Sequence, residues 1–165
     1  MTRKEQLYHF LEGTGPDKYG RMLKDIWFYS NQQLEYCHNY IQWMFPTDKI
    51  SLYNPWAPTL TQDDLLYFKT DKIQKNMMVS LNIMLEFYGF IWDGDKIVFL
   101  DANREHLNYW MYPDSHNYLR ITRILKSLKL FGLEDLAEKF FIALDSLYAE
   151  YPNRIGKSIN YWKEA

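Results

Sequence analysis

Residues 115 to 152, "SHNYLRITRILKSLKLFGLEDLAEKFFIALDSLYAEYP", carry the clearest helical pattern in the chain. Ser115 or Asp114 can cap a helix over about residues 116 to 131, and a glycine follows it as a stop signal. A second helix is expected over about residues 133 to 151, because the proline after it cannot continue the helix. Two long helices in succession, with no strand pattern between them, predict an all-α fold.

Shorter helical segments precede this pair, and one follows it. We expect helices at about residues 4–12, 18–29, 31–45, 61–88 with a break near Thr70-Asp71, 101–110 with Asp101 as its cap, and after Pro152. An Asp93-Gly94 pair between two apolar runs predicts one small β-hairpin near residues 90–100. The predicted architecture is therefore a single-domain orthogonal bundle of six or seven helices over residues 1–165.

Two capping boxes and a long loop organise the middle of the chain. Ser30-x-x-Gln33 marks the start of the 31–45 helix, and Thr61-x-x-Asp64 marks the start of the 61–88 helix. Between them, residues 46–60 contain prolines that exclude a helix, together with apolar residues that do not suit a loose linker. We predict a long loop pinned onto the body of the protein, and loops of this length are unusual unless they are functional.

The composition excludes several classes of protein. Lysines and arginines number 19 against 21 aspartates and glutamates, so a net charge of −2 gives no support for nucleic-acid binding. Cys37 is the only cysteine, which excludes an internal disulfide and a cysteine-rich zinc site. We see no secretory signal core and no apolar run long enough to span a bilayer, so we expect a soluble, cytoplasmic protein without membrane insertion. The many aromatic residues are expected mainly in the core.

Two polar stripes lie on helices that are otherwise apolar. They consist of Glu35, His38 and Gln42 on the 31–45 helix, and of His116, Arg120, Arg123 and Ser127 on the 116–131 helix. A polar stripe usually faces solvent. Histidines and arginines one turn apart can also bind the carboxylate or phosphate of a ligand. A carboxylate of the protein itself, such as Glu35 or Asp145, would satisfy the same arginines, and the sequence leaves the three interpretations open.

Metal and catalytic motifs are weak. Glu35-x-x-His38 has the spacing of one ligand pair of a di-iron bundle, but the second pair is missing, so no metal and no cofactor are predicted. No phosphate loop, nucleophile elbow or zinc-protease motif is present, and we assign no catalytic residue. Cys37 falls on the apolar stripe of its helix and is expected to be a core residue.

Four segments resemble the conserved domain of the opioid growth factor receptor family. They are "EYCHNYIQWMFP" (35–46), "SLYNPWAPTLT" (51–61), "LEFYGF" (85–90) and "HNYLRITRILKSLKLFGLEDLAEKFFIAL" (116–144). Segments similar to those of the family run from about Trp27 to Leu144 in the family's order. The first and last segments are long and unusual, which makes the resemblance specific.

The resemblance implies an all-helical domain and directs attention to particular residues. These are His38, Tyr40, Ile41, Gln42, Trp43, Phe45 and Pro46, then Asn54, Pro58 and Leu60, and then His116, Asn117, Arg120, Thr122 and Arg123. The family's named animal member is a receptor for the pentapeptide Met-enkephalin that associates with the nucleus and restrains growth. Short members occur in bacteria and fungi without an established role, and we expect this chain to be such a stand-alone microbial member. The family supplies no catalytic residues.

Taken together, these patterns favour a non-enzymatic, receptor-type module that binds a peptide or a small anion. Its pocket is predicted between the 31–45 and 116–131 helices, under the 46–60 loop. The candidate ligand-binding residues are His38, Gln42, Trp43, Asn54, His116, Asn117, Arg120 and Arg123. Arginines suit a peptide carboxylate and aromatic residues suit apolar side chains.

Two alternatives stay open. The protein could be an enzyme of unrecognised type with His38 or His116 as an acid or base, which requires the two side chains to converge in a concave site. It could also be a scaffold for protein interactions, which requires a large exposed apolar patch or a stable dimer interface. The sequence does not indicate the identity of a ligand or the oligomeric state.

Overall fold

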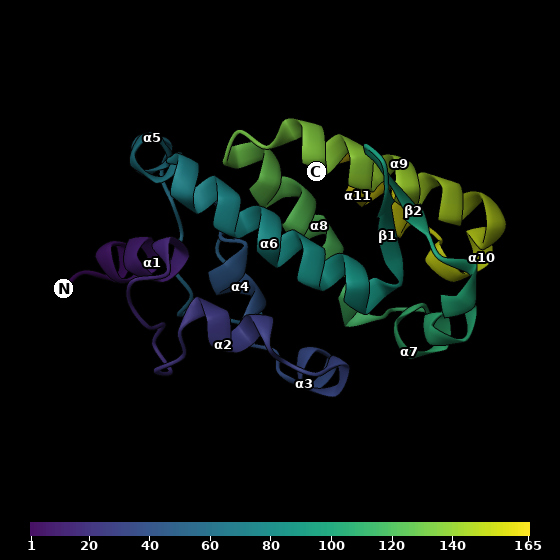
Figure 1. Cartoon of the computed structure of the whole chain (residues 1–165), viewed down its shortest axis with the longest axis horizontal. Helices are drawn as coiled ribbons and strands as arrows, with labels where there is room; N and C mark the ends of the chain where they lie inside the picture. The colour runs from purple at the N-terminus through teal and green to yellow at the C-terminus, as the bar shows by residue number, and fades with distance from the viewer.

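Three long helices run through the molecule: α6 (Asp71–Tyr88), α8 (His116–Leu130) and α9 (Glu134–Glu150) (Figure 1). The computed structural model describes residues 1–165. Helices α8 and α9 pack against each other, and both contact the C-terminal helix α11 (Ser158–Glu164). The predicted all-α fold is confirmed, and none of the helices combines the length and the apolar character that crossing a membrane requires.

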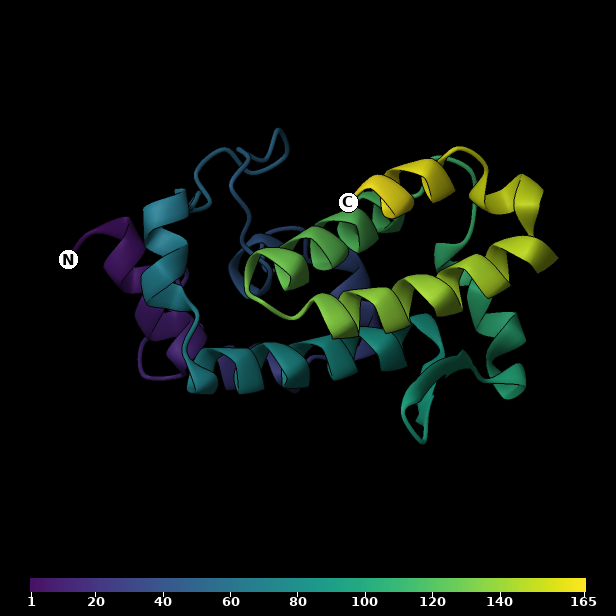
Figure 2. The ribbon, with the colours of Figure 1, turned by 90° about the horizontal axis from the view of Figure 1, so that it is seen from above.

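The shorter elements surround these three helices. They are α1 (Arg3–Glu12), α2 (Leu23–Trp27), α3 (Asn31–Tyr36), α4 (Ile41–Met44), α5 (Gln62–Phe68), β1 (Phe90–Asp93), β2 (Lys96–Phe99), the 3-10 helix η1 (Asp101–His106), α7 (Leu107–Trp110) and α10 (Pro152–Ile155). In Figure 2 the loop after α4 stands apart at one edge of the molecule, and α11 lies along α8.

The long helices begin and end at the capping and stop residues that the sequence predicts. The Ser115 hydroxyl accepts a hydrogen bond from the Asn117 N–H at 3.2 Å, which caps α8. Gly132 lies in the left-handed region, with φ +77°, and separates α8 from α9. Thr70 accepts from the Ile73 N–H at 3.2 Å and starts α6, so the predicted break there is confirmed. Such caps satisfy the N–H groups that the first turn leaves unpaired.

A single cluster of 40 buried apolar residues forms the core. Large aromatic residues contribute much of it, and their polar atoms bond to the main chain. The Trp110 indole N–H donates to the Tyr88 carbonyl at 3.1 Å, and the Trp162 indole N–H donates to the Tyr118 carbonyl at 3.0 Å. Burying a ring while its N–H keeps a partner avoids the cost of an unpaired polar group. The prediction that these aromatic residues form the core is confirmed.

Two predicted helices are shorter than expected. The helix expected at residues 18–29 begins only at Leu23, because the Asp17 carboxylate accepts the N–H groups of Tyr19 and Arg21, both at 2.9 Å, and closes a turn. The segment 101–110 starts as 3-10 helix. Its expected cap, the Asp101 carboxylate, pairs instead with the side chain of Arg104 three residues later.

The single helix predicted at residues 31–45 is wrong. The chain forms α3 as far as Tyr36, leaves the helical conformation at Cys37 with ψ 121°, and resumes as α4 at Ile41. The capping box at its start is confirmed, since Ser30 and Gln33 exchange hydrogen bonds of 2.9 and 3.2 Å. Residues 37–40 therefore form a break in the middle of the segment on which the predicted polar stripe depended.

The predicted hairpin is confirmed. Strands β1 and β2 are antiparallel, and the Asp93–Lys96 pair closes the turn, with Gly94 at φ +61°. The hairpin packs onto the body, where the Phe90 ring contacts the Phe140 ring of α9 edge-to-face at 5.7 Å. Packing against the helices explains why two short strands persist, since an isolated hairpin is marginal. Strand β2 contacts α9.

The end of α6 gives a test of this packing. Gly89 has φ +96°, and a Cβ atom there would meet the Phe99 ring at 2.7 Å and the Asn103 Cβ at 3.1 Å. Gly94 also has positive φ, but a Cβ there would meet nothing within 4 Å. We expect Gly89→Ala to lower the free energy of unfolding by about 2 kcal/mol or more, and Gly94→Ala by about 1 kcal/mol. Urea denaturation of both variants tests this, and equal losses would contradict the close approach at Gly89.

Candidate functional site

Arg120 of α8 holds the break between α3 and α4. Its Nη1 donates to the Leu34 carbonyl at 2.7 Å, and its Nη2 donates to the Cys37 carbonyl at 2.8 Å. The residue is only 5% exposed, and its guanidinium lies 5.2 Å from the centre of the Tyr40 ring. The last carbonyls of a helix have no partners within it. Arg120 thus supplies the donors that the end of α3 lacks.

A second arginine, Arg21, contacts the same break. Its Nη1 donates to the Asn39 side-chain oxygen at 2.8 Å, and its Nη2 donates to the Asn39 carbonyl at 3.2 Å. The buried Asp17 carboxylate pairs with Arg21 at 2.6 Å and fixes the guanidinium in place. Cys37 is half-buried and packs against the core as predicted, and its thiol donates to Asn39 at 3.2 Å.

Two further residues of the predicted stripe on α8 also bind main-chain carbonyls. Arg123 donates to the Phe45 carbonyl at 3.2 Å, and the Ser127 hydroxyl donates to the Pro46 carbonyl at 2.7 Å. Burial lowers the pKa of Arg123 to about 10. The three interpretations of this stripe were solvent, a ligand anion or an internal carboxylate. The arginines instead bind carbonyls of the protein's own backbone, in the segment 34–46.

A carboxylate and two histidines meet where α3 contacts the start of α8. Glu35 Oε1 lies 2.7 Å from His116 Nε2, and Asn117 Nδ2 donates to Glu35 Oε2 at 3.0 Å. The rings of His38 and His116 pack edge-to-face, with their centres 4.8 Å apart. Asn117 is fully buried and accepts from the Tyr88 hydroxyl at 3.2 Å. The structure thus brings His38, His116 and Asn117 together around Glu35.

Two groups of this cluster have displaced pKa values. Burial raises the pKa of Glu35, but hydrogen bonds from His116 and Asn117 and the charges of His116 and Arg120 outweigh it, so the pKa lies below its ordinary value of 4.5. The pKa of His38 is lowered from 6.5, first by burial and then by the charges of Arg120 and His116. The cluster therefore favours an ionised glutamate beside a neutral His38.

A pocket lies beside this cluster, but neither histidine of the cluster lines it. A pocket of about 390 Å³ lies next to Glu35. It is lined by Asn31, Gln32, Glu35, Tyr36, Phe87, His106 and Tyr109. The convergence of histidines that an acid–base site needs is present, but neither His38 nor His116 lines this pocket. No group of three or more histidine, cysteine, aspartate or glutamate side chains is placed to hold a metal ion.

Three other predicted site residues are buried, whereas the two histidines keep part of their surface exposed. Trp43 is 2% exposed and packs edge-to-face against Phe10, so it belongs to the core. Gln42 and Asn54 are both buried, and the Asn54 amide donates to the Gln42 side-chain oxygen at 3.3 Å. This bond attaches the 46–60 loop to α4, but the apolar residues Leu52, Tyr53 and Trp56 are exposed, so the predicted pinning of the loop holds only in part. In this structure Trp43, Gln42 and Asn54 bind protein groups.

A groove of about 560 Å³ lies between the 46–60 loop, α8 and the C-terminal helices. Its apolar walls include Tyr53, Leu119 and Tyr161, whose exposed fractions are 81%, 54% and 64%. Arg154 and Lys157 line it as well, and neither is in an ion pair. This groove borders the loop and α8, but it lies outside the contact between α8 and the 31–45 segment, where the pocket was predicted, and none of the eight candidate residues lines it.

Residues 154–161 supply six groove residues, and the sequence patterns did not indicate the three with long polar or aromatic side chains. Arg154 comes from α10, Lys157 precedes α11, and Tyr161 lies on α11. Their spacing of three and four residues would place them on one face of a continuous helix. Gly156 interrupts that helix, with φ +58°, so the pattern was weak in a segment expected only to be a short helix or an ordered tail.

Comparison with known proteins identifies relatives of this chain. Residues 11–165 match the family described as the "Opioid growth factor receptor (OGFr) conserved region". The chain is 33% identical over 141 residues to opioid growth factor receptor-like protein 1 of Xenopus tropicalis, covering 82% of this chain and 27% of that protein. It is 32% identical over 152 residues to the opioid growth factor receptor of Rattus norvegicus, covering 87% and 26%. The human receptor is 33% identical over 152 residues, covering 87% and 22%.

The chain thus spans about a quarter of the length of the curated relatives it matches. No solved structure matches it.

The role of Arg120 can be tested against a neighbour on the same helix. Arg120→Met leaves two short carbonyl bonds unmade and should lower the free energy of unfolding by about 3 kcal/mol. Arg123→Met removes one longer bond to Phe45 and should cost about 1 kcal/mol. Urea denaturation measures both changes. A loss for Arg120→Met no larger than for Arg123→Met would contradict the assignment.

The Glu35 contacts predict a pH dependence of stability. Because the folded-state pKa of Glu35 lies below its ordinary value of 4.5, its contribution is fully present above that value and is lost as the pH falls through the folded pKa. The free energy of unfolding, followed from about pH 6 to pH 3, should fall less steeply in Glu35→Gln than in the wild type. Glu138→Gln, at an exposed position outside any ion pair, should keep the wild-type slope. Identical slopes in Glu35→Gln and wild type would rule out the stabilising contacts.

Proposed function

Because the chain belongs to the opioid growth factor receptor family, we propose that it is a non-enzymatic, receptor-type module that binds a short peptide. The names of its relatives describe receptors and a receptor-like protein, and a peptide ligand for this chain is the extension that we make from them. The site that we propose is the groove formed by the 46–60 loop, α8, α10 and α11.

The observation that carries the proposal is the mixture of side chains in this groove. Tyr53, Leu119 and Tyr161 expose large apolar surfaces that the core has not taken up. A volume of about 560 Å³ lies within the range of small-ligand sites. Exposed aromatic residues grouped around a concavity are typical anchors for peptides, since they offer large contact areas and lose little side-chain entropy on binding.

The charges at the groove indicate which end of a peptide it suits. Arg154 and Lys157 are in no ion pair, and Asp114 is the one acid of the lining, so the groove keeps an excess of one positive charge that favours a carboxylate. Arg154 donates only to the Asn108 side chain, at 3.4 Å, and lies 5.2 Å from the centre of the Tyr151 ring. A guanidinium with free donors can hold a carboxylate through two parallel hydrogen bonds. We therefore place the C-terminal carboxylate of the peptide there.

The eight candidate residues selected from the sequence have different roles in this proposal: some border the groove, and the others hold the elements that form it. His116 follows Ser115, which lines the groove, and His38 packs against His116, so we assign both histidines to its border. Gln42 and Asn54 hold the loop that carries Tyr53. The remaining four are Trp43, Asn117, Arg120 and Arg123, and we assign them to the framework that positions α8.

The proposal is tested by calorimetric titration with Met-enkephalin and with its C-terminal amide. We expect the free acid to bind at least about tenfold more tightly than the amide, which is about 1.4 kcal/mol. Tyr53→Ala and Lys157→Gln should each weaken binding of the acid by about tenfold or more. Lys163→Gln, on α11 outside the groove, is the matched control and should leave the affinity unchanged.

Three results would overturn the proposal: no binding of either peptide, equal affinity for acid and amide, or unchanged affinity in Tyr53→Ala. Inorganic phosphate serves as the competitor for the small-anion alternative. If phosphate displaces the peptide fully and binds with similar affinity, the site recognises an anion and not a peptide.

A further inference from the structure

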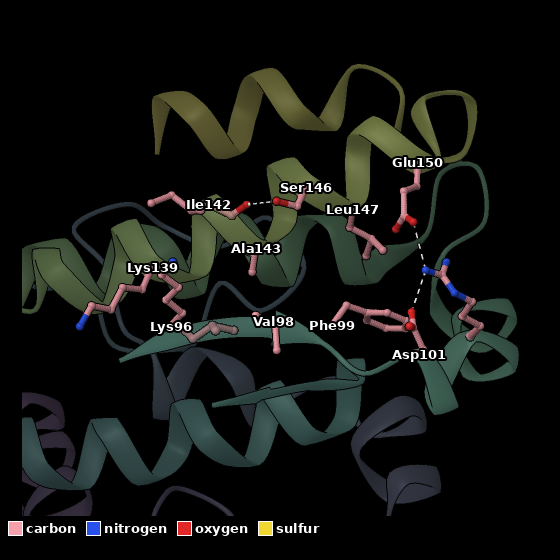
Figure 3. Close-up of a pocket in the computed structure, with 12 residues that line it drawn as sticks. Lys96, Val98, Phe99, Asp101, Lys139, Ile142, Ala143, Ser146, Leu147 and Glu150 are labelled. Carbon is pink, nitrogen blue, oxygen red and sulfur yellow. Dashed lines mark hydrogen bonds and ion pairs between the residues drawn. The ribbon is translucent and has the colours of Figure 1, made fainter. Parts of the chain in front are cut away.

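A second pocket lies on another part of the molecule, between β2 and α9 (Figure 3). Its volume is about 710 Å³. Its floor and walls include the apolar residues Val98, Phe99, Ile142, Ala143 and Leu147. Ala143 and Leu147 are buried, whereas Ile142 is 55% exposed and stands at the rim. The pocket shares no residue with the peptide groove.

The charges of this pocket are separated along its length. Lys96 and Lys139 lie together at one end, and Asp101 and Glu150 lie at the other (Figure 3). The two acids share one arginine: Arg104 Nη2 lies 2.9 Å from Asp101 and 3.0 Å from Glu150. The Arg104 guanidinium also donates to the Tyr151 hydroxyl at 2.6 Å. Two carboxylates against one guanidinium leave a net charge of −1 at this end, although both acids have a partner.

The two lysines have no such partners. Neither Lys96 nor Lys139 is in an ion pair. The Lys139 ammonium lies 5.9 Å from the centre of the Trp92 ring, which does not neutralise it, and its side chain points outward at this end of the pocket (Figure 3). One end of the pocket thus carries two uncompensated positive charges beside an apolar surface.

We propose that this pocket binds a small amphipathic anion, with a carboxylate between Lys96 and Lys139 and an apolar chain over Val98, Ala143 and Ile142. A carboxylate fits the lysine end because lysine ammonium groups donate charge-assisted hydrogen bonds without requiring fixed geometry. The apolar chain removes the exposed part of Ile142 from water and covers the floor. The unequal charges of the two ends orient the ligand in one direction.

The chemistry of the pocket distinguishes this ligand from others. A cation of the same shape would meet two ammonium groups at one end. At the other end it would meet only the net charge of −1 that remains when two carboxylates share one guanidinium, so it should bind more weakly than an anion and in the opposite direction. An uncharged chain would gain the apolar contacts but not the interaction with the lysines. A strongly hydrophilic anion would leave the apolar floor exposed. Decanoate, decanol and decyltrimethylammonium share one chain and differ in the head group, so they separate these contributions.

The experiment is an NMR titration of the full chain with each of these three compounds, below the concentration at which they form micelles. We expect decanoate to shift the amide signals of Val98, Ile142 and Ala143, and to bind about tenfold more tightly than decanol or decyltrimethylammonium. Lys96→Gln combined with Lys139→Gln should weaken decanoate binding by about tenfold. Ile142→Ser should weaken the binding of decanoate and decanol alike.

Lys157→Gln is the matched control, because it removes a lysine from the peptide groove and should leave decanoate binding unchanged. Its effect also separates this inference from the proposed function, since the two sites share no residue. Three results would overturn the inference: equal affinity for decanoate and decyltrimethylammonium, unchanged affinity in the double lysine variant, or shifts confined to the groove. Both lysine positions lie at the surface, and a thermal-unfolding curve that matches the wild type verifies the fold of each variant.

Discussion

The contact between Arg120 and the carbonyls of Leu34 and Cys37 is the interaction on which the N-terminal half of the fold depends. It joins the long helix α8 to the segment in which α3 ends at Tyr36 and the chain turns before α4 begins at Ile41. A buried guanidinium that lost these carbonyls would be left with unpaired donors. The Cys37 carbonyl would lose its partner, and the Leu34 carbonyl would keep only the Tyr40 hydroxyl, so the two sides are expected to form together. Arg123 and Ser127 extend the same contact to Phe45 and Pro46. Because the 46–60 loop begins at this contact, its position depends on the contact as well.

Sequence patterns predicted the long helices and their ends because those signals are local. Caps such as Ser115 and Thr70 and stops such as Gly132 act within a few residues of the helix they bound. The break at residues 37–40 could not be predicted in this way. The break is held by Arg21 and by Arg120, which lies about 80 residues away in the sequence. The spacing of apolar residues along a helix gives no information about a partner at that distance. Apolar residues at helical spacing therefore predicted one helix where tertiary contacts form two.

The candidate site likewise has features that the sequence indicates and features that only the folded structure creates. The polar residues of α8 were recognised as unusual, but their partners are main-chain carbonyls, which a sequence does not display. Glu35, His38 and His116 do meet, as the hypothesis of a shared polar site required. The groove combines residues 53, 119 and 154–161, and the second pocket combines β2 with α9, so each is created by the fold. Both expose apolar surface beside basic side chains that are in no ion pair, which suits ligands that carry a carboxylate.

Native-state hydrogen exchange in Arg120→Lys tests most directly whether α8 holds the segment from Leu34 to Phe45. A lysine keeps the charge but cannot bind two carbonyls at once with a fixed fork. We predict faster exchange of the amides of Leu34, Cys37 and Phe45, with protection in α9 unchanged. A uniform loss of protection across α9 and this segment, or no change at all, would contradict the account.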